Sequence, residues 1–207
     1  MKKSNLPNIA DLGLNIDLEK LRENCDSLAE KFIDVRTANP MLCDNHKKLV
    51  ASVYDNFEQI NLTEPSEILP FEASVKERLR RREEHLYNIP TSNYTNSYFE
   101  TVVKQCKSPA SRIRVTKLAS NKTIPFHVDY DINYAVRCIV PIYGDNQVVN
   151  LFRREGNLEA YNLENGRAYF LNIGYPHAVV NMSDQPRVAL MFSLDGIKDI
   201  EHLCSGI

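Results

Sequence analysis

Two histidines and one aspartate have the residue types and local spacing of a metal site. His127 and Asp129 belong to the run Phe126-His127-Val128-Asp129. In an extended strand, side chains two residues apart point to the same side, so these two can bind one ion together. His177, which lies between two strand-like runs, is the best candidate for a third ligand. Three protein ligands on one side of an ion leave its opposite side open.

Two imidazoles and one carboxylate form the ligand set of non-haem Fe(II) oxygenases. Asp131 is a rival carboxylate of the same strand parity, but Asp129 makes the closer pair, so we interpret Asp131 as a neighbouring or solvated residue. His46, His85 and His202 have no comparable partner. We interpret them as ordinary core or surface histidines.

One arginine opens a strand that is otherwise apolar. Arg187 precedes the run Val188-Ala189-Leu190-Met191-Phe192, and an inward guanidinium there is costly unless an anion pairs with it. Its planar fork suits a carboxylate that accepts two hydrogen bonds. A strand-end arginine in solvent is the alternative. The metal site nearby favours the interpretation that Arg187 binds a cosubstrate.

The second half of the chain has the pattern of an antiparallel sheet. From Ser111 on, short β-branched and aromatic runs are separated by turn residues. We predict strands over 113–118, 134–142, 148–153, 158–163, 168–173, 177–181 and 188–194. Seven short strands with hairpin turns favour a double-stranded β-helix, the jelly-roll form of cupins, over residues 111–195.

The first half has a different character, with charged and apolar residues at helical spacing. It predicts amphipathic helices over 17–33, 44–58 and 73–86, the last capped by Ser74 with Glu77 three residues on. We predict that residues 88–98 form a loop, which is a candidate substrate lid. Residues 197–204 are predicted to form a final helical turn or two. The fold class is thus mainly β with N-terminal helices, where residues 1–110 form a mostly helical buttress.

Composition places limits on the kind of protein. The chain of 207 residues, 43% hydrophobic and 25% charged, predicts one soluble domain over 1–207. A net charge of −2 argues against a protein that mainly coats nucleic acid or an anionic membrane, and no apolar run has spanning length. The five cysteines are scattered and include no Cys-x-x-Cys pair, so we expect reduced thiols and a cytoplasmic location.

Together these residues resemble a known family. The segment His127-Val128-Asp129, His177 and Arg187 is similar to the aspartyl/asparaginyl β-hydroxylase-like family of 2-oxoglutarate oxygenases, which includes bacterial proline hydroxylases. The spacing from the second histidine to the arginine is its most specific feature, and the resemblance covers about residues 111–195. The run from Gly166 to Arg187 carries the remaining matches, Gly166, Asn172, Val179 and Asn181.

The resemblance implies an Fe(II) enzyme that uses 2-oxoglutarate and O2, with ascorbate as a candidate stimulant. It implies hydroxylation of a free or peptidyl amino acid, with release of succinate and CO2. It also implies that Thr116 is a hydroxyl that binds 2-oxoglutarate with Arg187, and that Arg137 helps bind the other end of that cosubstrate. The family often has Arg-x-His at this point, whereas this chain has Arg137-Cys138-Ile139.

Two other classes of function stay open. A cupin-type metal enzyme without 2-oxoglutarate could use the same three ligands but would not need Arg187. A nucleic-acid or protein binder could use the basic run Arg78-Leu79-Arg80-Arg81-Arg82, although neighbouring glutamates make a solvated helix face the better interpretation. Candidate substrate contacts at the barrel mouth are Tyr94, Asn96, Tyr98, Arg153 and Arg112.

Overall fold

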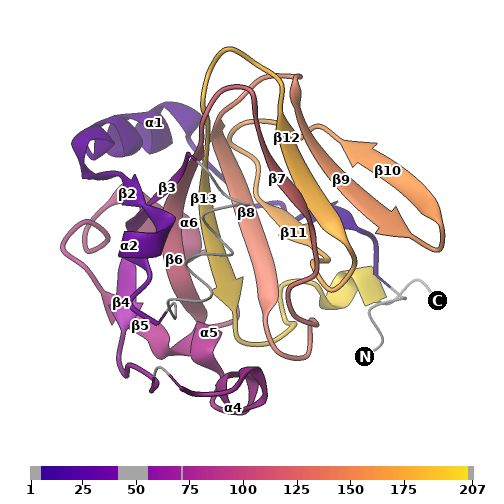
Figure 1. Cartoon of the computed structure of the whole chain (residues 1–207). Coiled ribbons are helices and arrows are strands. Elements are labelled where there is room, and N and C mark those ends of the chain that lie inside the picture. The colour runs from indigo at the N-terminus through magenta and orange to yellow at the C-terminus, as the bar shows by residue number, and fades with distance from the viewer. Residues whose placement is uncertain (1–5, 42–55, 71, 205–207) are drawn as a thin grey trace.

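Two antiparallel β-sheets form the centre of the protein (Figure 1). The computed structural model of the chain describes residues 6–41, 56–70 and 72–204. Within these residues, the larger sheet has seven strands, in the order β1 (Ile9–Asp11), β11 (Tyr169–Leu171), β8 (Val136–Tyr143), β13 (Arg187–Leu194), β6 (Ala110–Leu118), β3 (Phe57–Asn61) and β2 (Ile33–Asp34). The smaller sheet has four, in the order β10 (Asn157–Tyr161), β9 (Val148–Arg154), β12 (His177–Asn181) and β7 (Lys122–His127).

From β6 onward the chain passes back and forth between the two sheets. β6, β8, β11 and β13 lie in the larger sheet, whereas β7, β9, β10 and β12 lie in the smaller one. Two facing antiparallel sheets wound in this way are a double-stranded β-helix, or jelly roll. The predicted core fold is therefore confirmed, as is the presence of helices before it (Figure 1).

Each of the seven predicted strands corresponds to an observed strand, but β7 was not predicted. Its sequence contains Pro125, which cannot donate a backbone hydrogen bond to a neighbouring strand. β7 tolerates this proline because it is the edge strand of the smaller sheet. Asp129 lies two residues beyond the end of β7, so a loop and not the strand itself carries this carboxylate.

β13 is apolar without alternation because both of its faces are covered. Alternate side chains from Val188 to Leu194 belong to the large core cluster on the outer face of the sheet. Ala189 and Met191 pack in a second cluster that contains Phe152 of the smaller sheet, so they lie between the two sheets. Strand parity places Arg187 on this inner face as well.

Helices of the first half cover the outer face of the larger sheet. α1 (Leu18–Asp26) is capped by the side chain of Asp17, and α6 (Tyr98–Val103) by that of Ser97. Leu21 of α1 and Phe99 of α6 are fully buried in the large core cluster that includes alternate residues of β13. These two helices provide the predicted buttress.

The boundaries of the predicted helices need correction. The helix predicted over 17–33 ends at Asp26 and continues as η2 (Ala29–Lys31) and then β2. The helix predicted over 73–86 is divided into α4 (Val75–Arg80) and α5 (Glu83–Leu86) by Arg82, whose φ of 54° is left-handed. The Ser74 cap is confirmed, since its side chain accepts a hydrogen bond from the Glu77 backbone N–H at 3.2 Å.

The first half also contributes strands that helical periodicity could not reveal. Most of the helix predicted over 44–58 lies outside the described residues, and its last two positions begin β3, which pairs with β6. The remaining elements are α2 (Val35–Ala38), the pair β4 (Thr63–Pro65) and β5 (Tyr87–Pro90), and η3 (Glu201–Cys204). The last of these agrees with the helical turn predicted near the C-terminus.

The substrate lid predicted over 88–98 is wrong. Tyr94 is buried in the large core cluster on the outer face of the sheet. The hydroxyl of Tyr98 accepts a hydrogen bond from the Asp17 backbone N–H at 2.7 Å, so this residue joins two helix starts. The segment therefore packs the buttress onto the core and does not cover an opening.

Candidate active site

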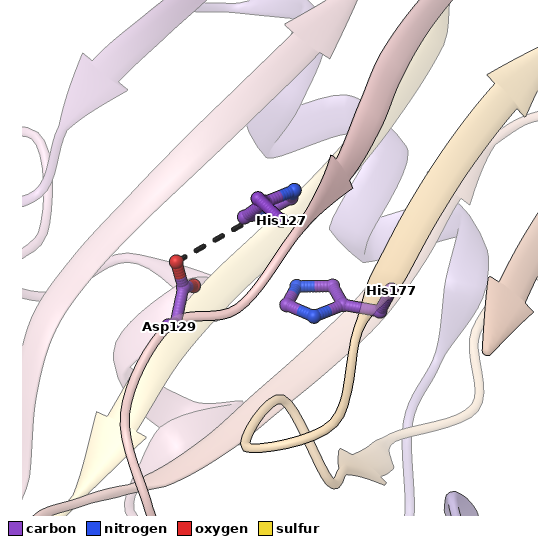
Figure 2. A group of neighbouring side chains, drawn as sticks. All are labelled: His127, Asp129 and His177. Atoms are coloured by element: carbon purple, nitrogen blue, oxygen red, sulfur yellow. Dashed lines mark ion pairs between the residues drawn. The ribbon is translucent and has the colours of Figure 1, made fainter. Parts of the chain in front are cut away.

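His127, Asp129 and His177 converge between the two sheets (Figure 2). His127 is the last residue of β7 and His177 is the first residue of β12, and the two are directly paired in the sheet. The loop after β7 returns Asp129 toward them, and its backbone N–H donates to the Ile173 carbonyl at 3.1 Å. One ligand atom from each residue lies within 4.8 Å of the other two. These are the three residues that the sequence predicted as metal ligands.

Backbone carbonyls orient both imidazole rings. The Nδ1 atom of His127 lies 2.8 Å from the Pro125 carbonyl, and that of His177 lies 3.0 Å from the Tyr175 carbonyl. Since a carbonyl only accepts, the proton of each neutral ring is on Nδ1, and Nε2 is the atom with a lone pair for a metal. The Nε2 of His127 is 3.8 Å from an Asp129 carboxylate oxygen.

His177 is held in the neutral form that a metal requires. Burial, followed by the neighbouring His127 ring, lowers the pKa of His177 to about 4. Its ring lies between those of His127, with centroids 4.2 Å apart, and Phe152, at 5.8 Å. The ring is therefore packed in place and uncharged near neutral pH.

A cavity of about 480 Å³ opens beside the three residues. Both sheets line it, and much of the wall next to the metal site is apolar, including Ile139, Phe152, Leu171 and Met191. Such a space is large enough for a small organic ligand, and its walls exclude water from most of that ligand's surface. The site thus combines a cluster of residues that could hold a metal ion with a binding cavity.

Arg187 lies in the wall of the same cavity and is only 4% exposed. No hydrogen bond or ion pair of its guanidinium occurs among the described residues. Burial lowers the pKa of Arg187 to about 10, and no nearby carboxylate opposes this effect. A buried guanidinium without a protein counter-ion is the expected binding group for an anionic ligand.

Asn150 lies in the same wall and was missed by the sequence reasoning. It is 4% exposed, and its position on β9 pairs with Val179 of β12. A polar residue at an inward position of a valine-rich strand was the available signal, because only a ligand or a hydrogen bond makes such a position favourable. Its amide can donate to an anion beside Arg187.

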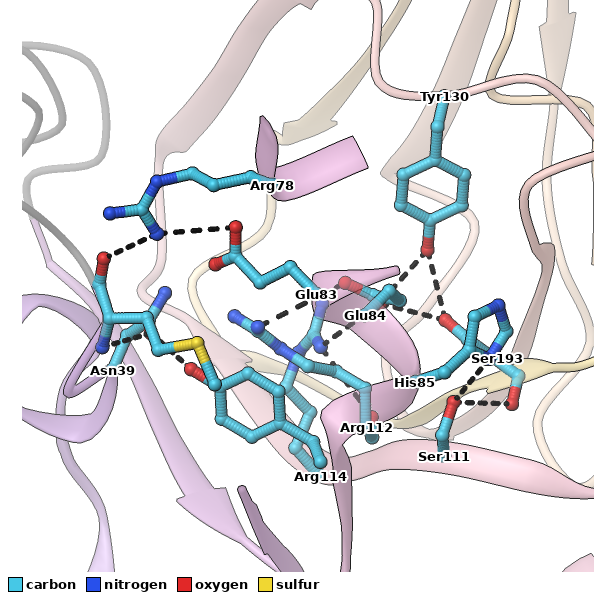
Figure 3. Close-up of polar contacts among 12 residues, drawn as sticks. Asn39, Arg78, Glu83, Glu84, His85, Ser111, Arg112, Arg114, Tyr130 and Ser193 are labelled. Atoms are coloured by element: carbon cyan, nitrogen blue, oxygen red, sulfur yellow. Dashed lines mark hydrogen bonds and ion pairs between the residues drawn. The ribbon is translucent and has the colours of Figure 1, made fainter. Parts of the chain in front are cut away.

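Arg137 also lines the cavity, in a dense hydrogen-bond network around Glu84, Tyr130 and Ser193, which Figure 3 labels. Its guanidinium donates to the Glu84 carboxylate at 2.9 Å and to the hydroxyl of Tyr130. Tyr130 and Ser193 also donate to Glu84, at 2.9 and 2.8 Å. The family resemblance implies a cosubstrate contact for Arg137, but nothing in the sequence pointed to Glu84, which lies 53 residues away.

The charge of Glu84 is stabilised by its neighbours. Burial alone would raise the pKa of this carboxyl, but Arg137, Arg112 and Arg114 outweigh burial and hold its pKa far below the ordinary range. Glu84 is therefore ionised throughout the neutral pH range. It fixes Arg137 on one side of the cavity.

Thr116, for which the family resemblance implies a cosubstrate contact, lies in the contact between two strands of the larger sheet. Its side chain is fully buried in β6, where the hydroxyl donates to the Ala189 carbonyl at 3.2 Å and contacts the sulfur of Met191. Thr116 is not among the residues that line the cavity. Its hydroxyl serves the contact between β6 and β13, so the predicted cosubstrate contact has no support here.

Of the other predicted substrate contacts, one lines the cavity and four do not. Arg112 lines the cavity, whereas Tyr94, Asn96 and Tyr98 do not. Arg153 is also absent from the lining, and its guanidinium packs over the ring of Phe126 at 4.9 Å.

The basic run of the first half does not form an open basic surface. Arg78 pairs with Glu83 at 3.2 Å, and Arg82 pairs with Asp195 at 2.7 Å. Arg81 forms an ion pair with Glu67. These pairs agree with the interpretation of a salt-bridged helix face and give no support to a nucleic-acid site.

Comparisons with known proteins agree with the residue pattern. The family profile described as aspartyl/asparaginyl beta-hydroxylase matches residues 72–195. No curated protein matches this chain. No helix in the described part of the chain is long and apolar enough to cross a membrane.

Solved structures include distant likenesses. A 2OG-Fe(II) oxygenase family oxidoreductase from Burkholderia pseudomallei has a TM-score of 0.42 and 10% identity, with 90% of this chain and 96% of that chain covered. Oxalate oxidase in complex with glycolate has a TM-score of 0.35 and 13% identity, with 41% of each chain covered. A cupin domain from Bordetella pertussis Tohama I has a TM-score of 0.34 and 16% identity, with 44% and 88% covered. The match thus spans about two fifths of the oxalate oxidase chain.

Proposed function

The chain belongs to the aspartyl/asparaginyl β-hydroxylase family, and on that premise we propose that it is an Fe(II)- and 2-oxoglutarate-dependent oxygenase. Its proposed reaction is hydroxylation of an amino acid or an amino-acid-derived substrate, free or within a peptide, with release of succinate and CO2. One observation carries this proposal: three metal-type ligands and a buried arginine that has no partner among the described residues line a single cavity.

The donor set fits Fe(II). His127 and His177 present Nε2 atoms whose rings are fixed through Nδ1, and Asp129 supplies the carboxylate. Two neutral nitrogens and one anionic oxygen suit a metal ion of intermediate softness, such as Fe(II). This group of three contains no cysteine thiolate, the ligand that softer metal ions prefer. When bound, Fe(II) with O2 and 2-oxoglutarate supplies the oxidation of a C–H bond.

Arg187 fits the distal carboxylate of 2-oxoglutarate. Its fork can donate two parallel hydrogen bonds to that carboxylate, and the neighbouring Asn150 amide can add a third. A dicarboxylate is a suitable ligand because one of its ends can reach the metal while the other neutralises the buried guanidinium. A cupin-type enzyme without 2-oxoglutarate gives no reason for an unpaired arginine at this place.

Residues of the cavity wall orient the ligands and exclude water. Ile139, Leu171 and Met191 form an apolar part of this wall and offer no polar side chain of their own to the cosubstrate. Arg137, fixed by Glu84 and Tyr130, keeps a positive charge near Asp129 and the open side of the metal site. These residues hold the reactants in place, while the metal supplies the chemistry.

We further propose that residues 1–207 form one domain. The large core cluster joins Leu21 and Phe99 of the buttress to Phe192 of the jelly roll, so the two halves share one core. A reducing, cytoplasmic location remains our proposal, in keeping with the free thiols of Cys25, Cys106 and Cys138. The partners that we expect are small-molecule or peptidyl substrates, without nucleic acid or membrane.

Metal binding is the first test of the proposed function. Anaerobic titration with Fe(II) should show one equivalent bound by the native chain and none by the Asp129→Ala/His177→Ala double variant. Asp131→Ala is the matched control, because Asp131 accepts hydrogen bonds from Asn133 within its own turn and should leave binding unchanged. Binding that survives the double variant, or that is lost in the control, would contradict the assignment.

Turnover is the second test. The protein is incubated with Fe(II), ascorbate, 2-oxoglutarate and a panel of amino acids, and mass spectrometry follows succinate and any product that has gained one oxygen atom. Succinate formation coupled to such a product supports the proposal. A native protein that binds Fe(II) but neither binds nor consumes 2-oxoglutarate would favour the cupin-type alternative.

A further inference from the structure

The described lining of the cavity carries more positive than negative charge. It includes five arginines, Arg78, Arg112, Arg114, Arg137 and Arg187, and three carboxylates, Glu83, Glu84 and Asp129. If Arg187 binds the cosubstrate and Asp129 the metal, four arginines remain against two glutamates. Buried charge of one sign is costly, so the surplus calls for an anion that comes with a ligand.

Glu84 cannot neutralise this surplus by itself. Its oxygen Oε1 already accepts hydrogen bonds from Arg137, Tyr130 and Ser193. Arg112 and Arg114 come no closer to it than 3.9 Å. Figure 3 shows both arginines beside Glu84, with which each forms one long ion pair.

Arg112 and Arg114 are held in place but keep donors available. The guanidinium of Arg112 stacks over the ring of Tyr87, 3.9 Å from its centroid, which leaves its in-plane N–H groups for other partners. Among the described residues, the one hydrogen bond of the Arg114 guanidinium is to the Arg112 carbonyl at a long 3.5 Å. Both side chains line the cavity and are about one-eighth exposed, at 13% and 12%.

The electrostatic state of Arg114 agrees with a missing counter-ion. Burial, then the charges of Arg137 and Arg112, lower the pKa of Arg114 to about 9, and Glu84 only partly opposes them. An arginine in protein stays protonated, so this shift expresses the cost of burying its charge beside Arg137 and Arg112. A bound carboxylate would remove that cost.

The cosubstrate cannot be this counter-ion if Arg187 holds its distal carboxylate. On β6 the partner of Arg187 is Leu118, and Arg114 lies four residues away, opposite Met191. At about 3.3 Å per residue, the two backbone positions are roughly 13 Å apart. Arg187 and Arg114 therefore serve different ends of the cavity and different anions.

We propose that Arg114, with Arg112, binds a free carboxylate of the primary substrate and so selects acids over their amides. The inference rests on the proposed function and deepens it, because it gives the substrate class as a carboxylate-bearing molecule. Glu84 acts as a positioning residue: it fixes Arg137 and keeps the two remaining guanidiniums directed at the cavity. An amide in place of the carboxylate would bring no charge to offset the buried guanidinium of Arg114, which Glu84 at 3.9 Å stabilises only in part.

Ligand binding tests this directly and needs no turnover. The native protein is loaded with Mn(II) and saturated with N-oxalylglycine, an unreactive isostere of 2-oxoglutarate. It is then titrated with the twenty standard L-amino acids and, separately, with their C-terminal amides, and thermal shift and calorimetry report binding. At least one free acid should bind, and its amide should bind about 30-fold more weakly or worse.

Arg114→Gln should weaken the binding of that acid by about 30-fold or more while N-oxalylglycine binds as before. Lys117→Gln is the matched control, because Lys117 is on the same strand, pairs with Glu58 on the other face and does not line the cavity. It removes one positive charge and should leave acid binding unchanged. The ligand-free Arg114→Gln protein should melt at the same temperature as the native protein or higher, because the variant loses a buried charge that Glu84 compensates only in part.

Several results would overturn the inference: no free acid binds, acid and amide bind equally, or Arg114→Gln keeps native affinity. A lowered melting temperature of ligand-free Arg114→Gln would indicate a structural role instead. Failure of the proposed function gives a different pattern. In that case N-oxalylglycine does not bind the native protein, yet a free acid still binds through Arg114 without it.

Discussion

Arg137 and Arg187 are both buried arginines on the inner face of the larger sheet, but their surroundings differ. Arg137 donates to Glu84 and Tyr130 in a network that Ser193 also joins. Arg187 has no such partner among the described residues and is equally buried, at 4% exposed. A charge that the protein neutralises is part of its scaffold, whereas a charge that it leaves unpaired is prepared for a ligand.

The largest expected effect is on stability, and it comes from breaking the hydrogen-bond network around Glu84 and Arg137. Glu84→Gln removes the negative charge that compensates Arg137, Arg112 and Arg114, so it should lower the free energy of unfolding by about 3–5 kcal/mol. Urea denaturation followed by circular dichroism measures this loss. Glu83→Gln is the control, since the one ion pair of Glu83 within the described part of the chain is with Arg78, and its loss should cost much less.

A loss below about 1 kcal/mol in Glu84→Gln would mean that the arginines do not depend on this carboxylate. In that case Arg137 could not be distinguished from Arg187 by its dependence on a protein counter-ion.

The next effect concerns the unpaired arginine, and it should appear in binding and not in folding. Arg187→Ala should weaken 2-oxoglutarate binding by about 30-fold or more, because the distal carboxylate is then buried without a partner. Fe(II) binding should persist, since no proposed metal ligand is changed. Calorimetry under anaerobic conditions measures both affinities.

Arg187→Lys should recover only part of this loss, because an ammonium group cannot donate two parallel hydrogen bonds. Native affinity for 2-oxoglutarate in Arg187→Ala would remove the cosubstrate role from this residue.

The smallest effect is expected on the other side of the same sheet. Cys138 neighbours Arg137 in β8 but points away from the cavity into the large core cluster, where it is fully buried. Burial raises the pKa of this thiol well above its ordinary value, so it is an inert apolar group. Cys138→Ala should cost about 1 kcal/mol of stability and leave turnover intact. Lost turnover with an intact fold would reveal a functional thiol.

The sequence by itself determined the core of this protein. Period-two patterning with turn residues after position 110 gave the strands of the jelly roll, because an extended chain with one or two buried faces leaves that pattern in its residues. His127, Asp129 and His177 were also identifiable, since few residue types bind a metal and two of the three lie two residues apart. The apolar run after Arg187 also indicated that this arginine is buried, because a strand without polar alternation is covered on both faces.

Only the tertiary structure decided which distant residues share the cavity. β3 joins the larger sheet through its pairing with β6, and α5 places Glu84 beside Arg137 from 53 residues away. Thr116 shares the inner face with cavity residues, yet its hydroxyl is used by the Ala189 carbonyl. Local periodicity reports which face a side chain occupies but not what stands opposite it, because long-range pairing and packing supply those partners.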